Sequence, residues 1–526
     1  MASVDNWISL FKDRTGSKEY LKNDYGVKYH KFEEKRELLL SLLKLHKEKF
    51  DNEEIIIVRA PGRINLMGRH IDHQGGDVNL IAIDQEIFIT AALRKDSKIS
   101  VYNIDENSFR NFQFDFSSLN SKLLKDWKEL LNSEDFLLKY RSPGGSWDNY
   151  IKAAYLRIVN RFNKIDFLGA NICISGNIMI AAGLSSSTAL IVGTFQAFLE
   201  LNKIRLNDDE IIDLCTEAEW FVGTRGGSAD QIAIKLARKN QIIHAKLFPL
   251  ALNWIEILKD CELIIFNSQI IADKSGSKID IFNERILAYD IGFHLIKMSF
   301  PQLTSKLHYL RDFNPEKLNI ESAKLIKLLS KLPEYVNFKE IPKILGNMWD
   351  EIKKNYCFNE IPQKIPIRKV IVYGISECER SILFYESLKI GDIKSAGKLM
   401  YISHNGDRVV FFNRKCESRP YNNDLDDIKL ENYLKADISI EQISGGYGCS
   451  IPEIDFIIDL VKSHDGVFGA QLSGAGMGGC AMILVEKKKR DIIKKLINDN
   501  YMKYFKKRCE IYCCQPVNGL SIYSSI

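Results

Sequence analysis

Three short segments rich in glycine and small hydroxyl residues contain the residue types in this sequence that could carry chemistry. The central segment reads Gly183-Leu184-Ser185-Ser186-Ser187-Thr188-Ala189-Leu190, and an apolar stretch follows it directly. Glycine lets the backbone approach a ligand closely, and free N–H groups at the start of a helix attract phosphate. An ordinary helix cap is the alternative, but a cap needs one serine rather than three. We therefore predict a phosphate-binding loop formed by Gly183, Leu184, Ser185, Ser186 and Ser187.

The other two segments lie far from the first. Residues 60–68 read APGRINLMG near the N-terminus, and residues 472–480 read LSGAGMGGC near the C-terminus. Either could be a simple turn, because glycine and proline are common in turns. The central segment has neither the Walker A pattern GxxxxGK[ST] nor the pattern GxGxxG. Taken singly, these segments do not identify a function.

The composition limits the classes of protein to which the chain can belong. It has 526 residues, enough for two or more domains, and 45% of them are hydrophobic and 27% charged. A formal charge of +5 is too small for this length to indicate binding to nucleic acid or to an anionic membrane. The eleven cysteines are scattered, and the first residues lack the apolar core of a signal peptide. We therefore expect a reduced, cytoplasmic protein.

The elements that would position these segments alternate between helical and strand patterns. The first fifty residues show helical spacing, and residues 54–59 and 79–93 read as strands, the first closed by Pro61-Gly62. Helices are expected over residues 147–162, from about residue 186, and over residues 208–221. Residues 411–448 are polar and are interpreted as an insertion loop or flap. The pattern favours an α+β protein of two lobes, residues 1–260 and 261–526.

In this order and spacing, the three segments resemble the motifs of the GHMP family of small-molecule kinases, most closely its galactokinase branch. That branch looks like APGRxNLxGEHxDY, then GLSSSAAL, then GxGxGGC. Three more stretches also agree with the branch: residues 217–231, 380–404 and 449–460. The resemblance implies a two-lobed GHMP kinase fold, with mixed sheets, helices packed on one side, and an active site between the lobes.

The resemblance also implies a reaction, in which ATP phosphorylates the anomeric hydroxyl of a sugar. The catalytic aspartate of the family falls on Asp230 and its partner arginine on Arg63. A carboxylate can orient a hydroxyl and take its proton, and a guanidinium beside it offsets charge on the transferring group. An ordinary salt bridge is the plain alternative for this pair. A non-catalytic sugar sensor is the rival function, although such proteins usually carry damage in these motifs.

The family's ATP and Mg²⁺ contacts can be carried over in the same way. Residues 183–187 would wrap the ATP phosphates, and residues 474–479 would support the pocket by close backbone approach. The magnesium ligands fall on the hydroxyl of Ser187 and on a glutamate before the catalytic aspartate. Glu219 is favoured for that carboxylate and Glu217 is the reserve, because the EAEWFVG stretch is one residue shorter than the family's AExxFVG.

The sugar contacts implied by the resemblance include one departure from the family pattern. His70 and Asp72 are retained and would bond sugar hydroxyls, with Gly227 beside them, but Arg69 replaces the family's glutamate. A guanidinium fork suits a carboxylate, and IDHQGG at residues 71–76 looks like the same stretch of plant galacturonokinases. The favoured substrate is therefore galacturonate or another acidic galactose derivative.

Other readings of the substrate stay open at this point. Arg69 could instead point away and pair with a nearby acid such as Asp77, and the substrate would then be galactose or another hexose. Phe282 aligns loosely with a family tyrosine, so one hydroxyl contact is lost. The expected partners are thus a small sugar and ATP, with no nucleic acid and no membrane, on a monomer or homodimer.

Overall fold

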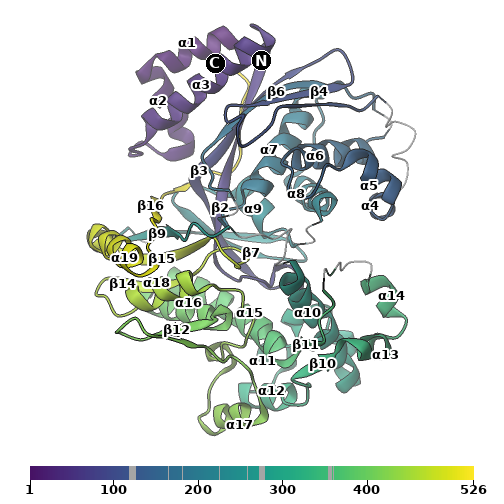
Figure 1. Cartoon of the computed structure of the whole chain (residues 1–526), viewed down its shortest axis with the longest axis vertical. Helices are drawn as coiled ribbons and strands as arrows, with labels where there is room; N and C mark the ends of the chain where they lie inside the picture. The colour runs from purple at the N-terminus through teal and green to yellow at the C-terminus, as the bar shows by residue number, and fades with distance from the viewer. Residues whose placement is uncertain are drawn as a thin grey trace.

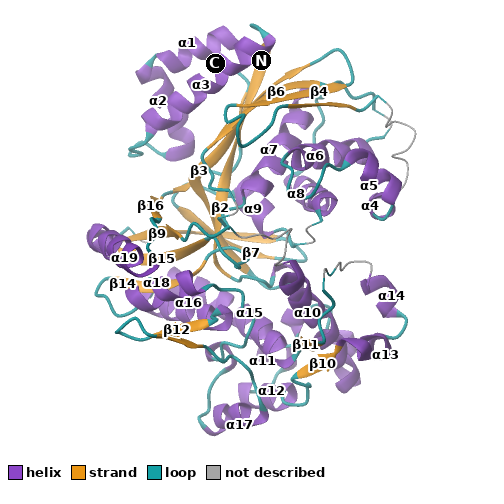
Figure 2. Ribbon diagram, in the orientation of Figure 1, coloured by secondary structure: helices purple, strands orange, loops and turns teal. Residues whose placement is uncertain are grey.

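The first lobe is built on one large mixed sheet with the strand order β1-β2-β3-β6-β4-β5 (Figures 1 and 2). The computed structural model describes the whole chain except residues 118–125, 164, 181, 224–225, 258, 272–278, 354–357, 359 and 526. β4 pairs with β6 in parallel and the other pairings along this path are antiparallel. These strands are β1 (Ala2–Ser3), β2 (Glu54–Met67), β3 (Val78–Leu93), β4 (Lys98–Asn103), β5 (Phe112–Asp115) and β6 (Ala170–Gly176).

Further strands extend this sheet from its middle. β7 (Gln241–Lys246) and β17 (Pro516–Val517) pair with β3, β18 (Ser521–Tyr523) pairs with β2, and β8 (Ala251–Glu256) pairs with β7. The chain thus returns to the first lobe at its end. The division near residue 260 stays a prediction, since the second sheet does begin with β9 (Cys261–Asn267) but the last strands belong to the first.

β2 carries the first glycine-rich segment and is longer than the sequence predicts. The expected end at Pro61-Gly62 is wrong, because the strand continues to Met67 with a shift of register between these two residues. A bulge accommodates a proline that has no N–H to donate. A side chain on Gly62 would lie 2.9 Å from the carbonyl oxygen of Leu184. This close approach places the next residue, Arg63, directly against the central glycine-rich segment.

Helices cover both faces of this sheet, because alternate residues of β2 point to opposite sides. Ile56 and Val58 pack into one core, and Ile55 and Ile57 pack into another. In Figure 1 the N-terminal helices lie to the left of the sheet and the central helices to its right. The N-terminal helices are α1 (Val4–Lys12), α2 (Arg14–Tyr25) and α3 (Phe32–Phe50). The central ones are α4 (Trp127–Leu131), α5 (Glu134–Tyr140), α6 (Asp148–Arg161), α7 (Ser186–Leu201), α8 (Asp208–Glu219) and α9 (Ala229–Leu236).

The second lobe combines a small sheet with two groups of helices. The sheet has the order β14-β15-β9-β16, formed by β14 (Val467–Leu472), β15 (Cys480–Glu486), β9 and β16 (Glu510–Cys514). α16 (Ile393–Asp407), α18 (Pro452–Val461) and α19 (Arg490–Phe505) pack near it, and α10 (Ile279–Ser299) packs on α15 (Arg368–Lys389). The remaining elements of this lobe are α11 (Pro315–Leu318), α12 (Ser322–Leu329), β10 (Tyr335–Asn337), α13 (Ile341–Leu345), α14 (Met348–Lys353) and β11 (Lys364–Pro366). The predicted α+β class is confirmed. The expectation of helices packed on one side is wrong for the first lobe, because both faces of its sheet carry apolar residues that helices cover.

Residues 411–448 are not the loop or flap that their polar composition predicts. They complete a hairpin of β12 (Val410–Phe412) and β13 (Ser418–Pro420), and then form α17 (Asp427–Lys435). Arg380 on α15 donates from Nη1 to the carbonyl oxygen of Ile443 at 2.8 Å. The N–H of Gly446 donates to the carbonyl of Lys369 at 2.8 Å. The segment is therefore a folded part of the second lobe, held against α15.

Two wider expectations can be compared with the described residues. Every cysteine among them is a free thiol, and Cys357 lies outside them. None of the helices in the described part of the chain combines the length and apolar character that a membrane crossing needs.

Candidate active site

The central glycine-rich segment forms the turn that leads into α7, as its sequence predicts. We call residues 183–187 the phosphate loop. Ser185 adopts the left-handed conformation, with φ of 61°, and its side chain does not cap the helix. Ser186 and Ser187 are half-buried at the first turn. Because the Ser185 side chain does not cap the helix, the first N–H groups of α7 can donate to an external acceptor. This arrangement favours the binding of an anion.

Arg63 and Asp230 form a two-pronged ion pair at the edge of the phosphate loop. Nε of Arg63 lies 2.5 Å from Oδ1 of Asp230, and Nη2 lies 2.8 Å from Oδ2. The third nitrogen, Nη1, donates to the carbonyl oxygen of Gly183 at 2.7 Å. The hydroxyl of Ser185 also donates to the Asp230 carboxylate. β2, the phosphate loop and the start of α9 thus meet at one carboxylate, whose side chain keeps 26% of its surface exposed.

The third glycine-rich segment packs on the phosphate loop through two glycines. A side chain on Gly183 would lie 2.7 Å from the carbonyl oxygen of Ser473, and one on Gly474 would lie 2.7 Å from the Cα of Gly183. Both glycines have positive φ, 77° and 75°. The contact joins the two lobes at the loop. This geometry agrees with the predicted supporting role of residues 474–479.

The two glutamates considered as magnesium ligands have different partners. Glu219 contacts the start of α7, whereas Glu217 is paired with an arginine. The hydroxyl of Thr188, in the first turn of α7, donates to Glu219. Glu217 instead forms an ion pair with Arg157, with Nη2 and Oε2 2.6 Å apart. The sequence favours Ser187 as the hydroxyl, yet the neighbour that contacts Glu219 is Thr188, one residue later. Hydroxyl and carboxylate oxygens are the hard donors that Mg²⁺ prefers, so this corner fits the ion.

Asp72 lies beside the residues that lead into Asp230. A side chain on Gly227 would collide with the Asp72 carboxylate, so the two residues are in close contact. Nδ1 of His73 lies 3.3 Å from Oδ1 of Asp72. Burial alone would raise the pKa of Asp72, but the bond to His73, its charge and the backbone N–H groups of His73 and Ala229 lower it. Asp72 is therefore an ionised hydrogen-bond acceptor, and its contact with a sugar stays a prediction.

Arg69 and His70 meet a partner that the motifs do not reveal. Nη2 of Arg69 donates to Oδ2 of Asp407 at 2.8 Å and to the hydroxyl of Ser403 at 3.0 Å. Nε2 of His70 lies 3.4 Å from Oδ1 of Asp407, and its ring stacks on Tyr447 at 4.0 Å. Arg69 is 2% exposed. The prediction of a free guanidinium fork is wrong, and the alternative pairing exists with Asp407 rather than with Asp77.

The opposite charges of Arg69 and Asp407 shift the pKa values of both side chains. Burial alone would raise the pKa of Asp407, but the charges of Arg69 and His70 and their hydrogen bonds lower it, so the carboxylate is ionised. The pKa of Arg69 is raised by Tyr373, Asp407 and Glu377, although its burial opposes this. Phe282 lies on α10, half-buried against the core of the second lobe.

Sequence reasoning missed Asp407, Thr188 and Tyr447. Asp407 stands 338 positions from Arg69 and follows the SH pair of residues 403–404, a stretch that resembles the family. That adjacency is a weak signal, because the family motif assigns no acid at this position. Thr188 could have been found from its place in the first helical turn beside Ser187.

Comparisons with known proteins agree with the three motifs. The galactokinase galactose-binding signature matches residues 44–93, the GHMP kinase N-terminal domain matches residues 149–238, and the GHMP kinase C-terminal domain matches residues 421–501. Galactokinase of Clostridium tetani is 28% identical, over 84% of this chain and 87% of its own. Galactokinase of Roseiflexus sp. is 24% identical, over 88% and 92%.

A solved structure shares the fold. Lactococcus lactis galactokinase, crystallised with galactose, superposes with a TM-score of 0.64 over 91% of this chain and 98% of its own. Its sequence is 21% identical to this one. The likeness therefore supports the shared architecture of two lobes.

Proposed function

Because the chain belongs to the galactokinase branch of the GHMP kinases and is a sugar kinase, we propose that it transfers the γ-phosphoryl group of ATP to the anomeric hydroxyl of a neutral, galactose-type sugar. The observation that carries this proposal is the Arg63–Asp230 pair, joined to the phosphate loop by Gly183 and Ser185. An isolated salt bridge would not share partners with a phosphate-binding turn. Galactose is the sugar we favour.

Asp230 acts on the sugar hydroxyl. Its carboxylate accepts the hydroxyl proton and aims the oxygen at the phosphoryl group. Arg63 fixes both carboxylate oxygens and, through Gly183, the start of the loop. Its positive charge also offsets the negative charge that develops during transfer. The two residues therefore align the nucleophile with the phosphates and keep the carboxylate available.

The phosphate loop and its acidic neighbour hold the other substrate. The N–H groups at the start of α7 would bind phosphate oxygens, as helix N-termini do. Ser187, Thr188 and Glu219 would hold Mg²⁺, with Glu217 left in its pair with Arg157. When bound, the ion neutralises phosphate charge. Ser187 stands in the same first turn of α7 as Thr188.

The contacts of Arg69 favour a neutral sugar over a sugar acid. A guanidinium grips a carboxylate along an edge formed by two nitrogens, and Nη2 belongs to both such edges. Asp407 and Ser403 already occupy this nitrogen. Nε and Nη1 have no hydrogen-bond partner among the described residues. Each can donate singly to a hydroxyl, but the pair cannot form a fork.

An acidic galactose derivative is the second candidate. The two unpartnered donors of Arg69 favour it, since a buried cation with free N–H groups attracts an anion. The substitution of Arg69 for the family's glutamate and the IDHQGG stretch support the same reading. A non-catalytic sensor is the less supported alternative, because Arg63, Ser185 and Asp230 are all in contact.

The test is ADP release by the purified full chain with galactose, galacturonate and other hexoses. We expect galactose to give the highest kcat/KM, and Asp230→Asn to lower kcat by at least about a hundredfold. Asp209→Asn, on the exposed start of α8, is the matched control and should behave like the wild type. Phosphorylation at the anomeric position also removes the reducing end of the sugar. Sugar binding without ADP release from any sugar would overturn the kinase proposal.

A further inference from the structure

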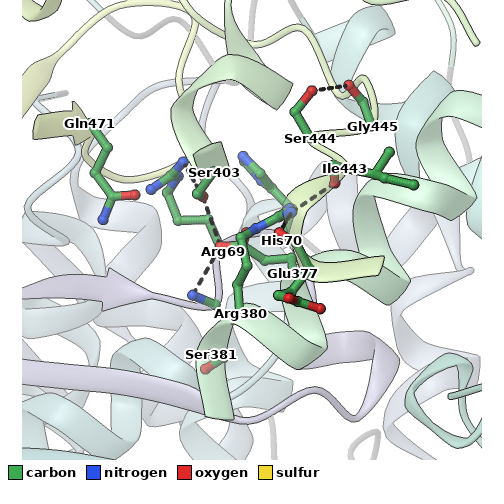
Figure 3. Close-up of polar contacts among 12 residues, drawn as sticks. Arg69, His70, Glu377, Arg380, Ser381, Ser403, Ile443, Ser444, Gly445 and Gln471 are labelled. Atoms are coloured by element: carbon green, nitrogen blue, oxygen red, sulfur yellow. Dashed lines mark hydrogen bonds and ion pairs between the residues drawn. The ribbon is translucent and has the colours of Figure 1, made fainter. Parts of the chain in front are cut away.

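Arg69 belongs to a closed group of buried charges. Glu377 and Arg380 lie on α15, and Asp407 ends α16; all three side chains are fully buried. Nε of Arg380 lies 2.8 Å from Oε2 of Glu377, and the hydroxyl of Ser403 links Glu377 to Arg69. Figure 3 shows Arg69 and His70 facing the two helices that carry these partners. Two cations and two anions thus balance each other inside the protein.

Removal of one member would leave an uncompensated charge in this group. A buried ion whose partner is lost seeks another counter-charge, because the interior solvates it poorly. Arg69 has Asp407 as its direct ion-pair partner, while Glu377 is paired with Arg380. Asp407 therefore decides whether the guanidinium is available to an external anion.

We propose that Asp407 is a specificity-determining residue, which occupies Arg69 and so makes the sugar site favour a neutral sugar over a sugar acid. The inference rests on the proposed function, in which Arg69 faces the sugar. Without the charge of Asp407, one N–H of Nη2 is released while Ser403 keeps the other. One edge of the guanidinium can then grip a carboxylate. The same substitution then turns the preference toward galacturonate.

The backbone at Asp407 is anchored without its side chain. Its carbonyl oxygen accepts the N–H of Ser450 at 2.8 Å, and the N–H of the next residue, Arg408, bonds the carbonyl of His404 at 2.9 Å. An asparagine has the same shape and still offers an oxygen to His70. The variant Asp407→Asn therefore changes charge more than geometry.

A metal site is the other reading of this cluster. His70, Asp407 and Cys449 bring possible ligand atoms within 4.8 Å of one another. Arg69 already neutralises Asp407 at 2.8 Å. Burial raises the pKa of the Cys449 thiol well above its ordinary value, which disfavours the thiolate that a metal requires. The cluster is therefore better explained by charge control than by an ion.

The experiment compares kcat and KM for galactose and galacturonate in the full chain. For Asp407→Asn we expect the galacturonate-to-galactose ratio of kcat/KM to rise about tenfold, mainly through a lower KM for galacturonate. Asp407→Glu keeps the charge and should stay within about threefold of the wild type. Asp459→Asn, which weakens the separate pair with Arg408, is the matched control. The double variant Arg69→Gln/Asp407→Asn should lose the gain.

The outcomes separate the two proposals. A wild type that phosphorylates no sugar contradicts the proposed function. Activity on galactose together with an unchanged ratio in Asp407→Asn overturns the role of Asp407 and leaves the kinase intact. An equal rise in Asp407→Glu, or a rise that survives the loss of Arg69, also overturns it. If the asparagine variant does not accumulate, Asp407→Ser removes the same charge in a smaller side chain and carries the same expectation.

Discussion

The contact between Gly183 and Gly474 provides a test of how the two lobes hold the phosphate loop. A Cβ on Gly474 would lie 2.7 Å from the Cα of Gly183 and 2.8 Å from its carbonyl oxygen. These are backbone atoms, so they cannot rotate away as a flexible side chain would. The substitution Gly474→Ala therefore forces either the phosphate loop or the turn between β14 and β15 to move.

Two separate effects set the expected magnitude. The φ of Gly474 is +75°, and a left-handed conformation costs a non-glycine residue about 1–2 kcal/mol. A methyl group forced into a filled contact costs about 1–3 kcal/mol more. We expect Gly474→Ala to lose about 2–5 kcal/mol of unfolding free energy. The KM for ATP should rise about tenfold or more, because displacement of a positioning group is costly.

Gly391 supplies the matched control. Its φ is +80°, but a Cβ at this position would have no atom within 4 Å. Gly391→Ala should therefore lose only the conformational part, about 1–2 kcal/mol, and keep the wild-type KM for ATP. Urea unfolding followed by tryptophan fluorescence and a coupled ADP assay measure the two quantities. If both alanine variants lose the same unfolding free energy and keep the wild-type KM for ATP, the packing of Gly474 on Gly183 does not constrain the phosphate loop.

Four further substitutions test other parts of the site and fold. Arg63→Lys cannot hold both carboxylate oxygens, so kcat should fall about a hundredfold with KM for sugar changed less than about threefold; an unchanged kcat in steady-state assays would contradict this. Glu219→Gln should lower kcat about a hundredfold and raise the Mg²⁺ concentration needed for activity. Glu217→Gln should lower only the unfolding free energy, by up to about 1 kcal/mol. The reverse pattern in Mg²⁺ titrations would exchange the roles of the two glutamates. Burial and then the charge of Glu441 raise the pKa of Glu379 to about 7. Folding therefore favours its protonated form, and stability falls as pH rises from about 4.5 to 7. In Glu379→Gln, the difference in unfolding free energy between pH 4.5 and pH 8 should be smaller than in the wild type by up to about 3 kcal/mol. Urea unfolding at the two pH values measures it, and the same difference in both proteins would refute the assignment.

The local parts of the site could be predicted from the sequence. The phosphate loop is a run of adjacent residues at the start of a helix, so a short stretch of sequence contains all the residues that form it. Arg63 and Asp230 were predicted because each lies in a motif, although 167 positions separate them. The strand of residues 79–93 and the helix from residue 186 follow from hydrophobic periodicity, which local sequence also contains.

Contacts between distant segments could not be predicted in this way. No pattern around Arg69 indicates that Asp407 neutralises it, because the pairing depends on how the end of α16 packs against the residues that follow β2. Residues 411–448 were interpreted as a loop because they are polar. Their helix, α17, is polar because it buries a single residue, Leu430, and exposes most of its surface. The polar composition of residues 411–448 therefore indicates that they are exposed to solvent, not that they lack secondary structure.

The Arg63–Asp230 pair and the phosphate loop share their contacts, so a substitution in one should also affect the other. Arg63 bonds both Asp230 and Gly183, and Ser185 of the loop bonds the same aspartate. A displacement of the loop therefore alters the direction of the carboxylate, and loss of the arginine loosens the loop. Changes in kcat and in KM for ATP should accordingly appear together for residues of this group. A substitution that raises KM for ATP alone must act on a part of the nucleotide that this network does not touch.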